Sequence, residues 1–410
     1  MYLARLSLTN FRNFARLDVD VPQGAVLLVG ANAQGKTSLL EAVYFLATFS
    51  SFHTGSDRQL INFLAAREPL AVARIVADFS RIDSLATART HHLEVRVIQE
   101  ANELNHEPRV RKEVFLDGVK TKVGESVGFF NAVLFLPQSL RVIEGSPEER
   151  RRYLNLSLSQ VIPKYSQCLA DYTQALIQRN ALLKQLNERA GDPDELSYWD
   201  GLLATAGAQI IHARIRSIQE LESRASVVHN RLTRSGEVLR LDYEPAFDPL
   251  PQPARQFALP LDAPLDRMGI PVEKIQQAFV ERLAAMRSEE IARGQTTIGP
   301  HRDDIRFLSN GIDLEVYGSR GQARTAMLSM KLAEVTWMKD KTGQWPVLLL
   351  DEVLAELDQF RRDDLLSHLA DSEQILMTTT DLDLFSTEFV KRATRWQIQS
   401  GRLSEVNHGR

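Results

Sequence analysis

One short segment constrains this chain more than any other, because it specifies a strand, a loop and a helix in that order. Residues 25–29 are apolar throughout, which is typical of a strand buried on both faces of an α/β sheet. The sequence GANAQGKT at 30–37 follows and fits the pattern G-x-x-x-x-G-K-[ST] without a mismatch. Apolar residues then recur at helical spacing from Leu39 to Leu46. We therefore expect a sheet strand that delivers a glycine-containing loop to the start of a helix.

A loop of this kind binds phosphate groups, since its backbone N–H groups point inward and the helix that follows adds a positive end. Lys36 is expected to reach the β and γ phosphates of a nucleotide, and the Thr37 hydroxyl is expected to hold Mg²⁺. The alternative is an ordinary turn that happens to contain glycines and a lysine. The flanking strand and helix favour nucleotide binding. The predicted nucleotide contacts in this segment are Gly30, Ala31, Asn32, Ala33, Gln34, Gly35, Lys36, Thr37 and Ser38.

A second apolar strand, VLLL at 347–350, ends in two acidic residues, Asp351 and Glu352. Asp351 can hold Mg²⁺ through water, and Glu352 can orient or activate an attacking water. Many buried strands end in an acid, so this pattern gains its weight from the phosphate-binding loop elsewhere in the chain. The acidic pair predicts hydrolysis of ATP rather than binding alone. The predicted catalytic residues are Glu352, Lys36 and Asp351.

A third segment, SRGQ at 319–322, precedes another stretch of helical periodicity and lies 32 residues before Asp351. It resembles the signature motif of ABC-type ATPases in its S-x-G-Q form. In that family a serine and backbone amides at a helix start contact the γ-phosphate that the opposite subunit holds. The resemblance implies that Ser319, Gly321 and Gln322 contact nucleotide. A capped turn without a ligand is the alternative.

Three smaller features fit the same family. Gln138 is a candidate Mg²⁺-sensing glutamine, although a solvated loop glutamine is an equal alternative. The segment AELD at 355–358 resembles the D-loop that follows the acidic strand end. The segment TTTD at 378–381 ends another apolar strand, where the family often has a histidine, so a threonine would have to contact the γ-phosphate.

Composition narrows the cellular setting and the kind of partner. The 410 residues are 44% apolar and 25% charged, which is ordinary for a soluble globular protein. A single cysteine, Cys168, excludes an internal disulfide and a cysteine-cluster metal site. No apolar run is long enough to span a membrane, so we expect a cytoplasmic protein without a membrane partner. The net charge of −4 means that any nucleic-acid surface must be a local patch.

The order of patterns along the chain predicts an α/β fold with a helical insertion. Strand-like segments occupy 72–79, 93–98, 114–116 and 133–136, with a hairpin turn at Asp117-Gly118. Ser146 and Glu149 then form a capping-box pattern, two long helical runs flank a breaker at 191–193, and a proline-rich stretch covers 244–271 before another helix over 272–293. The two runs suggest an antiparallel hairpin, either projecting or packed as a bundle. We expect a head formed by 1–135 and 296–410, and an inserted helical lobe over 136–295.

The whole pattern resembles one family, the RecF proteins, and more loosely the SMC-like ATPases. The resemblance is carried by LSLTNFRNF at 6–14, by Gly145 and Pro147 with Arg151-Arg152, by IGPHRDD at 298–304, and by the signature and acidic segments. It implies an ABC-type ATPase head and adds Arg12 and Asn13 to the nucleotide contacts, and Thr37, Asp351 and Gln138 to the Mg²⁺ site. The chain departs from the family at Asn155, where an aspartate is usual. The residue types of GPHRDD themselves indicate no role.

The resemblance also implies a function. The chain would dimerise with ATP, hydrolyse it slowly, bind double-stranded DNA or the edge of a single-strand gap, and help RecO and RecR load RecA. Two basic clusters are candidate DNA surfaces, since basic side chains suit phosphates. One cluster consists of Arg109, Arg111, Lys112, Lys120 and Lys122, and the other of Arg150, Arg151 and Arg152.

Other ATPase classes fit less well. An ABC transporter subunit has its signature much closer to the phosphate-binding loop, whereas Ser319 lies 283 residues after Lys36. An SMC-like DNA tether needs a far longer coiled coil than the helical insertion can provide. A nuclease of the OLD type needs an acidic domain after the ATPase, yet only 58 residues follow Glu352.

Overall fold

The chain divides into two compact units in the computed structural model, which describes residues 1–82, 87–101, 108–250 and 267–405. The first unit comprises Met1–Ser139 and Glu334–Arg410, and the second comprises Leu140–Ala333. The second limit therefore lies inside helix α9 (Arg320–Thr342) rather than at 295/296. The cause is strand pairing, because β10 (Asp304–Ser309), the first strand after residue 296, pairs with β9 (Leu239–Glu244) of the second unit. Ser319 thus belongs to the second unit.

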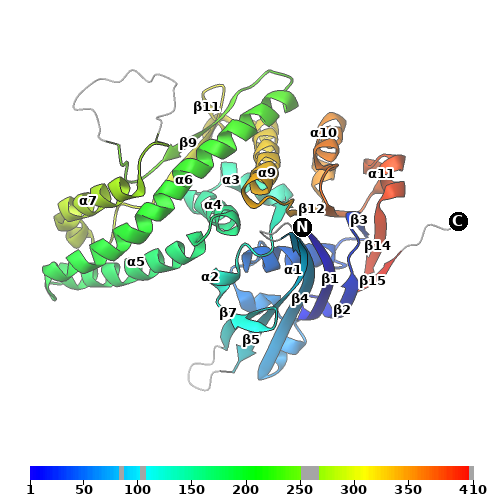
Figure 1. Ribbon diagram of the computed structural model, residues 1–410, viewed down its shortest axis with the longest axis horizontal. Coiled ribbons are helices and arrows are strands. Elements are labelled where there is room, and N and C mark those ends of the chain that lie inside the picture. The colour runs from blue at the N-terminus through cyan, green and yellow to red at the C-terminus, as the bar shows by residue number, and fades with distance from the viewer. Residues whose placement is uncertain (83–86, 102–107, 251–266, 406–410) are drawn as a thin grey trace. The chain divides into compact units, whose positions relative to one another are not determined.

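The first unit contains a sheet of order β15-β14-β3-β13-β12-β8 (Figure 1). All neighbouring pairs from β14 to β8 are parallel, and β15 pairs antiparallel at one edge. The inner strands are buried along almost their whole length, as the continuous apolar runs predict. The strands are β3 (Gly24–Val29), β8 (Ala132–Phe135), β12 (Val347–Asp351), β13 (Gln374–Thr379), β14 (Thr394–Gln399) and β15 (Arg402–Glu405).

An antiparallel sheet of order β2-β1-β4-β5-β6-β7 forms the other layer of the first unit. Its β6–β7 hairpin turns at Asp117 and Gly118, both with positive φ, which confirms the predicted turn. The strands are β1 (Tyr2–Phe11), β2 (Phe14–Asp20), β4 (Leu70–Ile82), β5 (Ala88–Glu100), β6 (Arg109–Leu116) and β7 (Val119–Thr121).

Helix α1 (Lys36–Thr48) connects the two layers, since it contacts β8, β12 and β13 of the parallel sheet and β4 of the antiparallel sheet. It is buried on nearly all sides, and its side chains join both sheets in one apolar core. The remaining helical elements here are η1 (Asp57–Leu60), η2 (Ala65–Arg67), α2 (Val123–Ser126), η3 (Pro137–Leu140), η5 (Val353–Glu356), α10 (Gln359–Leu369), η6 (Leu382–Leu384) and α11 (Thr387–Arg392).

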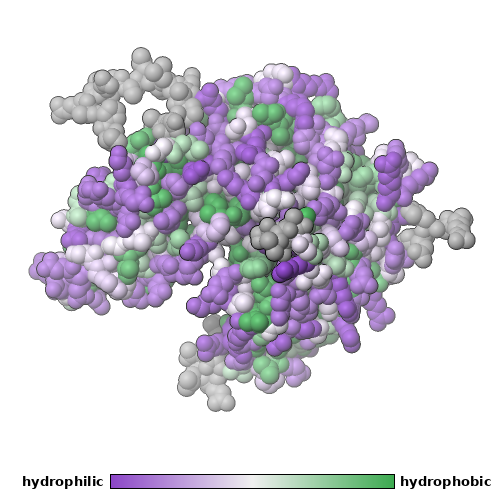
Figure 2. All heavy atoms as spheres, viewed as in Figure 1, coloured by the Kyte–Doolittle hydropathy of each residue, from purple (hydrophilic) through white to green (hydrophobic). Residues whose placement is uncertain are grey.

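The second unit is built on a helical hairpin, as the two long apolar runs predict. Helices α5 (Tyr165–Asn187) and α6 (Leu196–Leu232) pack side by side, and α7 (Val272–Arg293) packs on both (Figure 1). Hydrophilic side chains cover the turn between α5 and α6 (Figure 2). The other helical elements of this unit are α3 (Arg141–Glu144), α4 (Pro147–Val161), η4 (Pro193–Glu195) and α8 (Leu314–Tyr317). The predicted capping box at Ser146 and Glu149 is present at the start of α4.

A fully buried ion-pair network ties the three long helices together. Arg179 of α5 pairs with Asp200 of α6 and with Glu290 of α7, both at 2.7 Å, and all three side chains are at most 1% exposed. Arg287 of α7 adds a second pair to Asp200 at 2.7 Å. Arg179 is the one polar residue on the otherwise apolar face of α5, so at this position ion pairs replace hydrophobic packing between the helices.

The GPHRDD segment at 299–304 forms a second buried polar centre and thereby gains a structural role. Asp303 accepts hydrogen bonds from Arg214 at 2.8 Å and from the Tyr243 hydroxyl at 2.5 Å. Arg214 also donates to the backbone oxygen of Pro300 at 2.6 Å, and its other nitrogen donates to Asn155 at 3.1 Å. Asn155 therefore gives Arg214 a neutral acceptor.

Two further side chains of this segment connect it to its surroundings. Asp304 receives two hydrogen bonds from Arg150 of α4, at 2.6 and 2.8 Å. His301 shares a hydrogen bond with the Tyr172 hydroxyl of α5 at 2.7 Å, and burial lowers the pKa of His301 to about 4. The segment therefore fastens α4, α5 and α6 to the small sheet of this unit.

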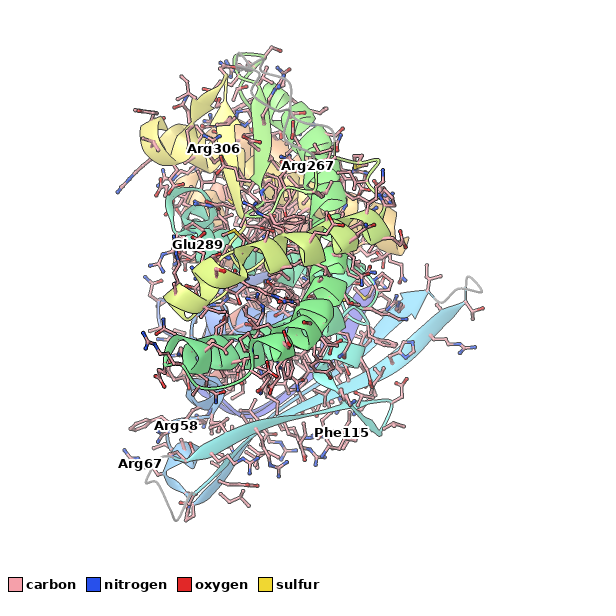
Figure 3. All side chains as sticks on the ribbon, turned by 90° about the vertical axis from the view of Figure 1, so that its left-hand side faces the viewer. Arg58, Arg67, Phe115, Arg267, Glu289 and Arg306 are labelled. Carbon is pink, nitrogen blue, oxygen red and sulfur yellow. The ribbon has the colours of Figure 1, made fainter. Side chains whose placement is uncertain are left out.

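That small sheet has the order β11-β10-β9, with β9 (Leu239–Glu244), β10 (Asp304–Ser309) and β11 (Ile312–Asp313). Arg306, labelled in Figure 3, pairs with Asp242 at 3.2 Å and with Glu244 at 2.6 Å across β9 and β10. Most of the proline-rich stretch expected over 244–271 lies outside the described residues. None of the helices in the described ranges combines the length and the apolar character needed to cross a membrane.

Candidate nucleotide site

The parallel sheet brings the predicted site residues of the first unit to one edge. Parallel strands end on the same side of a sheet, and this is where open α/β folds bind ligands. The phosphate-binding loop follows β3, the acidic pair follows β12, and the threonine segment follows β13. Gln138 follows β8, which neighbours β12. Four segments that are far apart in the sequence therefore meet at the carboxyl ends of adjacent strands.

Lys36 lies under the loop that precedes it. Its Nζ donates to the backbone oxygens of Gly30 at 2.6 Å and Ala31 at 3.2 Å, and it forms an ion pair with Glu352 at 3.1 Å. The side chain is 4% exposed, so this cation is concentrated inside the loop rather than in solvent. The Lys36 ammonium can thus exchange loop oxygens and a carboxylate for phosphate oxygens.

The geometry around Asp351 suits a hard cation. Thr37 Oγ1 donates to the Asp351 carboxylate oxygens at 2.9 and 3.0 Å, and Thr378 Oγ1 donates to Oδ1 at 2.7 Å. A hydroxyl and a carboxylate beside a phosphate loop form the oxygen-only donor set that Mg²⁺ takes together with nucleotide phosphates. Among the described residues there is no cluster of three or more His, Cys, Asp or Glu side chains that could hold a metal without such phosphates.

Glu352 adopts a left-handed backbone conformation, with φ of 51°. Such a conformation costs a non-glycine residue roughly 1 kcal/mol and is common where strain serves a site. Thr378 offsets this cost, because its Oγ1 accepts the Glu352 backbone N–H at 2.9 Å. Thr378 therefore holds both acidic residues, a role that the sequence did not indicate.

The phosphate-binding loop is fixed from two sides by turns remote in sequence. Asn13 donates to the backbone oxygen of Gln34 at 3.0 Å, and Gly401 donates to the same oxygen at 3.1 Å. The Ser400 backbone N–H donates to the Gln34 side-chain oxygen at 2.6 Å. Gly35 requires its glycine, since its φ is 113° and a Cβ would collide with the Asn13 amide. Asn13, predicted as a nucleotide contact, thus positions the loop in this structure.

Arg12, also predicted as a nucleotide contact, is bonded to other residues of the chain. Its guanidinium donates to both carboxylate oxygens of the buried Glu41 of α1, at 2.7 and 2.6 Å, and to the backbone oxygen of Gln59 at 2.9 Å. The Ser51 hydroxyl holds the same Glu41 carboxylate at 2.5 Å. These contacts anchor α1 to the turn between β1 and β2. The sequence pattern did not reveal Glu41 as the partner of Arg12, or Ser51 as a second donor to Glu41.

The remaining candidates of the first unit lie at the same edge with different degrees of exposure. Gln138 is exposed in η3. Thr379 is buried and its hydroxyl donates to the backbone oxygen of Asp381 at 2.7 Å, whereas Thr380 is exposed. Asp358 caps α10 by accepting the Arg361 backbone N–H at 2.9 Å. Of the three threonines, only Thr380 has a side chain that solvent reaches substantially.

The signature segment begins α9 with a reciprocal cap. Ser319 Oγ accepts the Gln322 backbone N–H at 3.2 Å, and the Gln322 side-chain oxygen accepts the Ser319 backbone N–H at 3.0 Å. Ser319 and Gly321 are exposed. A Cβ on Gly321 would meet only Ser319 Oγ, at 3.9 Å. None of the described residues therefore requires glycine there, although glycine costs a helix roughly 1 kcal/mol relative to alanine.

The two basic clusters proposed as DNA surfaces are largely engaged within the chain. Arg150 is 2% exposed and belongs to the buried GPHRDD centre, and Arg151 donates to the Asp303 backbone oxygen at 2.8 Å. The prediction that the cluster at 150–152 forms a DNA surface is therefore wrong for Arg150 and Arg151, whose side chains stabilise the fold. In the first cluster, Lys112 pairs with Asp57 at 2.9 Å, and Glu113 neutralises Lys120 at 2.7 Å.

The outer face of the antiparallel sheet is also internally paired. Hydrogen bonds from Arg74 and then Arg96 lower the pKa of Glu94 to about 2, against the opposing effect of burial. Arg96 lies over the ring of Phe115, labelled in Figure 3, at 4.6 Å from the ring centroid. On this face of the sheet, the basic side chains therefore alternate with acidic partners and do not form a uniformly positive surface.

Comparison with known proteins decides the family. The model of the RecF/RecN/SMC N-terminal domain matches residues 2–399. A RecF DNA replication and repair protein from Roseiflexus castenholzii is 39% identical over 98% of this chain and 99% of its own length. The chain belongs to the RecF family. A RecF protein from Ligilactobacillus salivarius is 34% identical over 99% of this chain and 98% of its own.

Solved structures agree with this family. A recombination mediator protein RecF with ATP, described as part of the RecFOR pathway, superposes with a TM-score of 0.79 at 29% identity, covering 99% of this chain and 98% of that one. An SMC head bound to a ScpA domain gives a TM-score of 0.51 at 16% identity, which shows a shared fold alone. The predicted class, an α/β fold with an ABC-type ATPase head, is confirmed.

Proposed function

We propose that this chain is an ATP-driven dimer that binds DNA in recombinational repair. Each ATP, with Mg²⁺, is held by the loop at 30–37 of one copy and by Ser319, Gly321 and Gln322 of the other. Lys36 neutralises the phosphates, Thr37 and Asp351 hold the metal, and Glu352 orients the attacking water. The chemistry of Mg²⁺ there is neutralisation of charge on the transferred phosphoryl group. Hydrolysis is slow and returns the copies to monomers.

One observation carries the proposal. Lys36, Thr37, Asp351 and Glu352 are brought together at one sheet edge, with Thr37 to Asp351 at 2.9 Å and Lys36 to Glu352 at 3.1 Å. This is the arrangement that binding and hydrolysis of a nucleoside triphosphate need. The exposed glycine of the signature supports the part of the proposal that places the second copy at the phosphates. No described residue crowds Gly321, and a glycine there suits close approach by an external phosphate.

DNA is the proposed macromolecular ligand, as double-stranded DNA or a junction between single- and double-stranded DNA. The family supports this choice, since its curated members are DNA replication and repair proteins. The relatives' RecFOR pathway supports RecO and RecR as partners that receive the ATP-bound dimer and load RecA. A tether of the SMC kind and a transporter ATPase remain the weaker alternatives.

A salt titration of duplex binding tests the proposal. With ATP, affinity should rise, and the slope of log affinity against log salt should steepen, because each phosphate contact contributes about −0.9 to that slope and a dimer presents more contacts than a monomer. Fluorescence anisotropy with wild-type protein, with and without ATP, measures both. Lys36→Ala with ATP is the matched control and should behave like the wild type without nucleotide. Equal affinity and slope under all conditions would contradict the proposal.

A further inference from the structure

An acidic residue, Glu237, contacts the signature segment through Gln322, which lies 85 positions later in the chain. Glu237 stands in the turn between α6 and β9. Its Oε1 accepts a hydrogen bond from the Gln322 side-chain nitrogen at 3.0 Å. The oxygen of the same Gln322 amide caps the Ser319 backbone N–H. Glu237 therefore restrains the amide that orients the serine.

The Glu237 carboxylate is itself fixed on its other oxygen. Oε2 accepts from the Ser309 hydroxyl at 2.8 Å and lies 3.2 Å from Nε2 of His229. Burial raises the pKa of Glu237, but the hydrogen bonds from Gln322, Ser309 and His229 outweigh burial and lower it overall. The Glu237 carboxylate is thus ionised and contacts β10 through Ser309, α6 through His229 and α9 through Gln322.

His229 links this carboxylate to the interior of the second unit. It is fully buried near the end of α6, and its Nδ1 lies 3.2 Å from the Ser329 hydroxyl, deeper in α9. The turn that carries Glu237 is also fastened to the β10–β11 turn, since Asn310 exchanges hydrogen bonds with Val238 at 2.9 and 3.0 Å. The position of Glu237 is therefore set by rigid elements and not by an isolated loop.

From these contacts we infer that Glu237 is a positioning residue for the signature segment, and that His229 and Ser309 hold it in place. Glu237 does not touch the nucleotide. It fixes the Gln322 amide, and through it the start of α9, in the orientation that the γ-phosphate of the opposing copy requires. The inference rests on the proposed function, because it assigns Glu237 to the signature half of each composite site.

The assignment predicts which half of the site a Glu237 variant damages. Glu237→Ala should bind ATP as tightly as the wild type, while kcat falls at least about tenfold, in line with the loss of a hydrogen bond to a charged group. Glu237→Gln keeps one acceptor for Gln322, so its kcat should lie between those of the wild type and Glu237→Ala. Glu244→Ala is the matched control, since Glu244 pairs with Arg306 across the small sheet, and it should keep wild-type kcat.

Mixtures of the impaired proteins separate this inference from the proposed function. Glu237→Ala mixed with Lys36→Ala should regain activity, up to about a quarter of wild type with random exchange, because one site of each mixed dimer is intact. Glu237→Ala mixed with Ser319→Arg should show no activity beyond that of the two separate proteins, because both changes damage the same half. Recovery in the second mixture, or wild-type kcat in Glu237→Ala, would overturn the inference.

The control mixture is Lys36→Ala with Ser319→Arg. If this control recovers and Glu237→Ala with Lys36→Ala does not, the Glu237 assignment alone is wrong. If the control also fails while dimers form, the composite site is wrong. Should Glu237→Ala not fold, the same mixtures with Glu237→Gln decide, and wild-type kcat in Glu237→Gln would overturn the inference.

Discussion

At the scale of single residues, the chemistry depends on groups that the fold restrains before any ligand arrives. Lys36 is held by two backbone oxygens and Glu352, and Asp351 is held by two threonine hydroxyls. Such restraint lowers the reorganisation needed when charge develops during phosphoryl transfer. The sequence motifs predicted Lys36, Thr37, Asp351 and Glu352. They included Thr378 in the TTTD segment as a possible phosphate contact, but not as the residue that holds Asp351 and Glu352. They did not predict Ser400 or Glu237, because a lone polar residue in a turn has no recognisable pattern.

Replacing Lys36 by alanine should abolish tight ATP binding. The substitution removes the cation inside the loop and leaves the phosphate charges poorly neutralised. Isothermal titration calorimetry measures the effect, with Lys391→Ala as a control, because Lys391 is an exposed lysine on α11. A dissociation constant unchanged from wild type would refute the assignment of the loop.

Replacing Glu352 by glutamine should preserve ATP binding but stall hydrolysis. The amide has nearly the same size but cannot accept a proton from water. Dimers should then accumulate with ATP, and light scattering with a coupled ATPase assay follows both quantities. Glu388→Gln on α11 is the matched control, since Glu388 lies in an exposed ion pair with Arg392, and it should hydrolyse ATP normally. A variant that stays monomeric at saturating ATP would count against an ATP-driven dimer.

At the scale of elements, sequence periodicity predicted most strands and helices of the described regions. Residue types alone did not predict the ion pairs whose two partners are far apart in the sequence. Arg150 and Asp304 are 154 positions apart, and Arg214 and Asp303 are 89 apart, so no local pattern showed that these charges neutralise one another in the interior. The second limit of the helical lobe was misplaced for a related reason, since pairing of β10 with β9 decides which unit residues 304–309 join.

The Arg179 network gives an element-scale prediction. Arg179→Met keeps length and packing but leaves Glu290, which is 0% exposed, without its cation. Removing one partner of a buried ion pair typically costs about 3–5 kcal/mol, whereas an exposed pair contributes about 0–1 kcal/mol. Urea unfolding of the second unit should show the larger loss for Arg179→Met. Arg293→Met, in an exposed pair on the same α7, should change stability little. Equal losses in the two variants would show that the network is not what joins α5 to α7.

At the scale of the whole molecule, the two halves of the proposed catalytic centre lie in different units of the chain. The loop at 30–37 and the acidic pair belong to the first unit, and Ser319 belongs to the second. This separation suits a switch, since ATP can join two copies only when the signature of one is presented to the phosphates of the other. DNA binding would then report the joined state, because the dimer offers a larger surface to phosphates.

Mixing Lys36→Ala with Ser319→Arg tests this central claim most directly. Each protein alone has two damaged sites and should be inactive, whereas a mixed dimer has one site with both defects and one with neither. ATPase activity should therefore return, to about a quarter of wild type if exchange is random and one intact site turns over alone. Dimer formation is followed in the same mixture by light scattering. Mixed dimers that form normally while ATPase stays at zero would contradict a site shared independently between two copies.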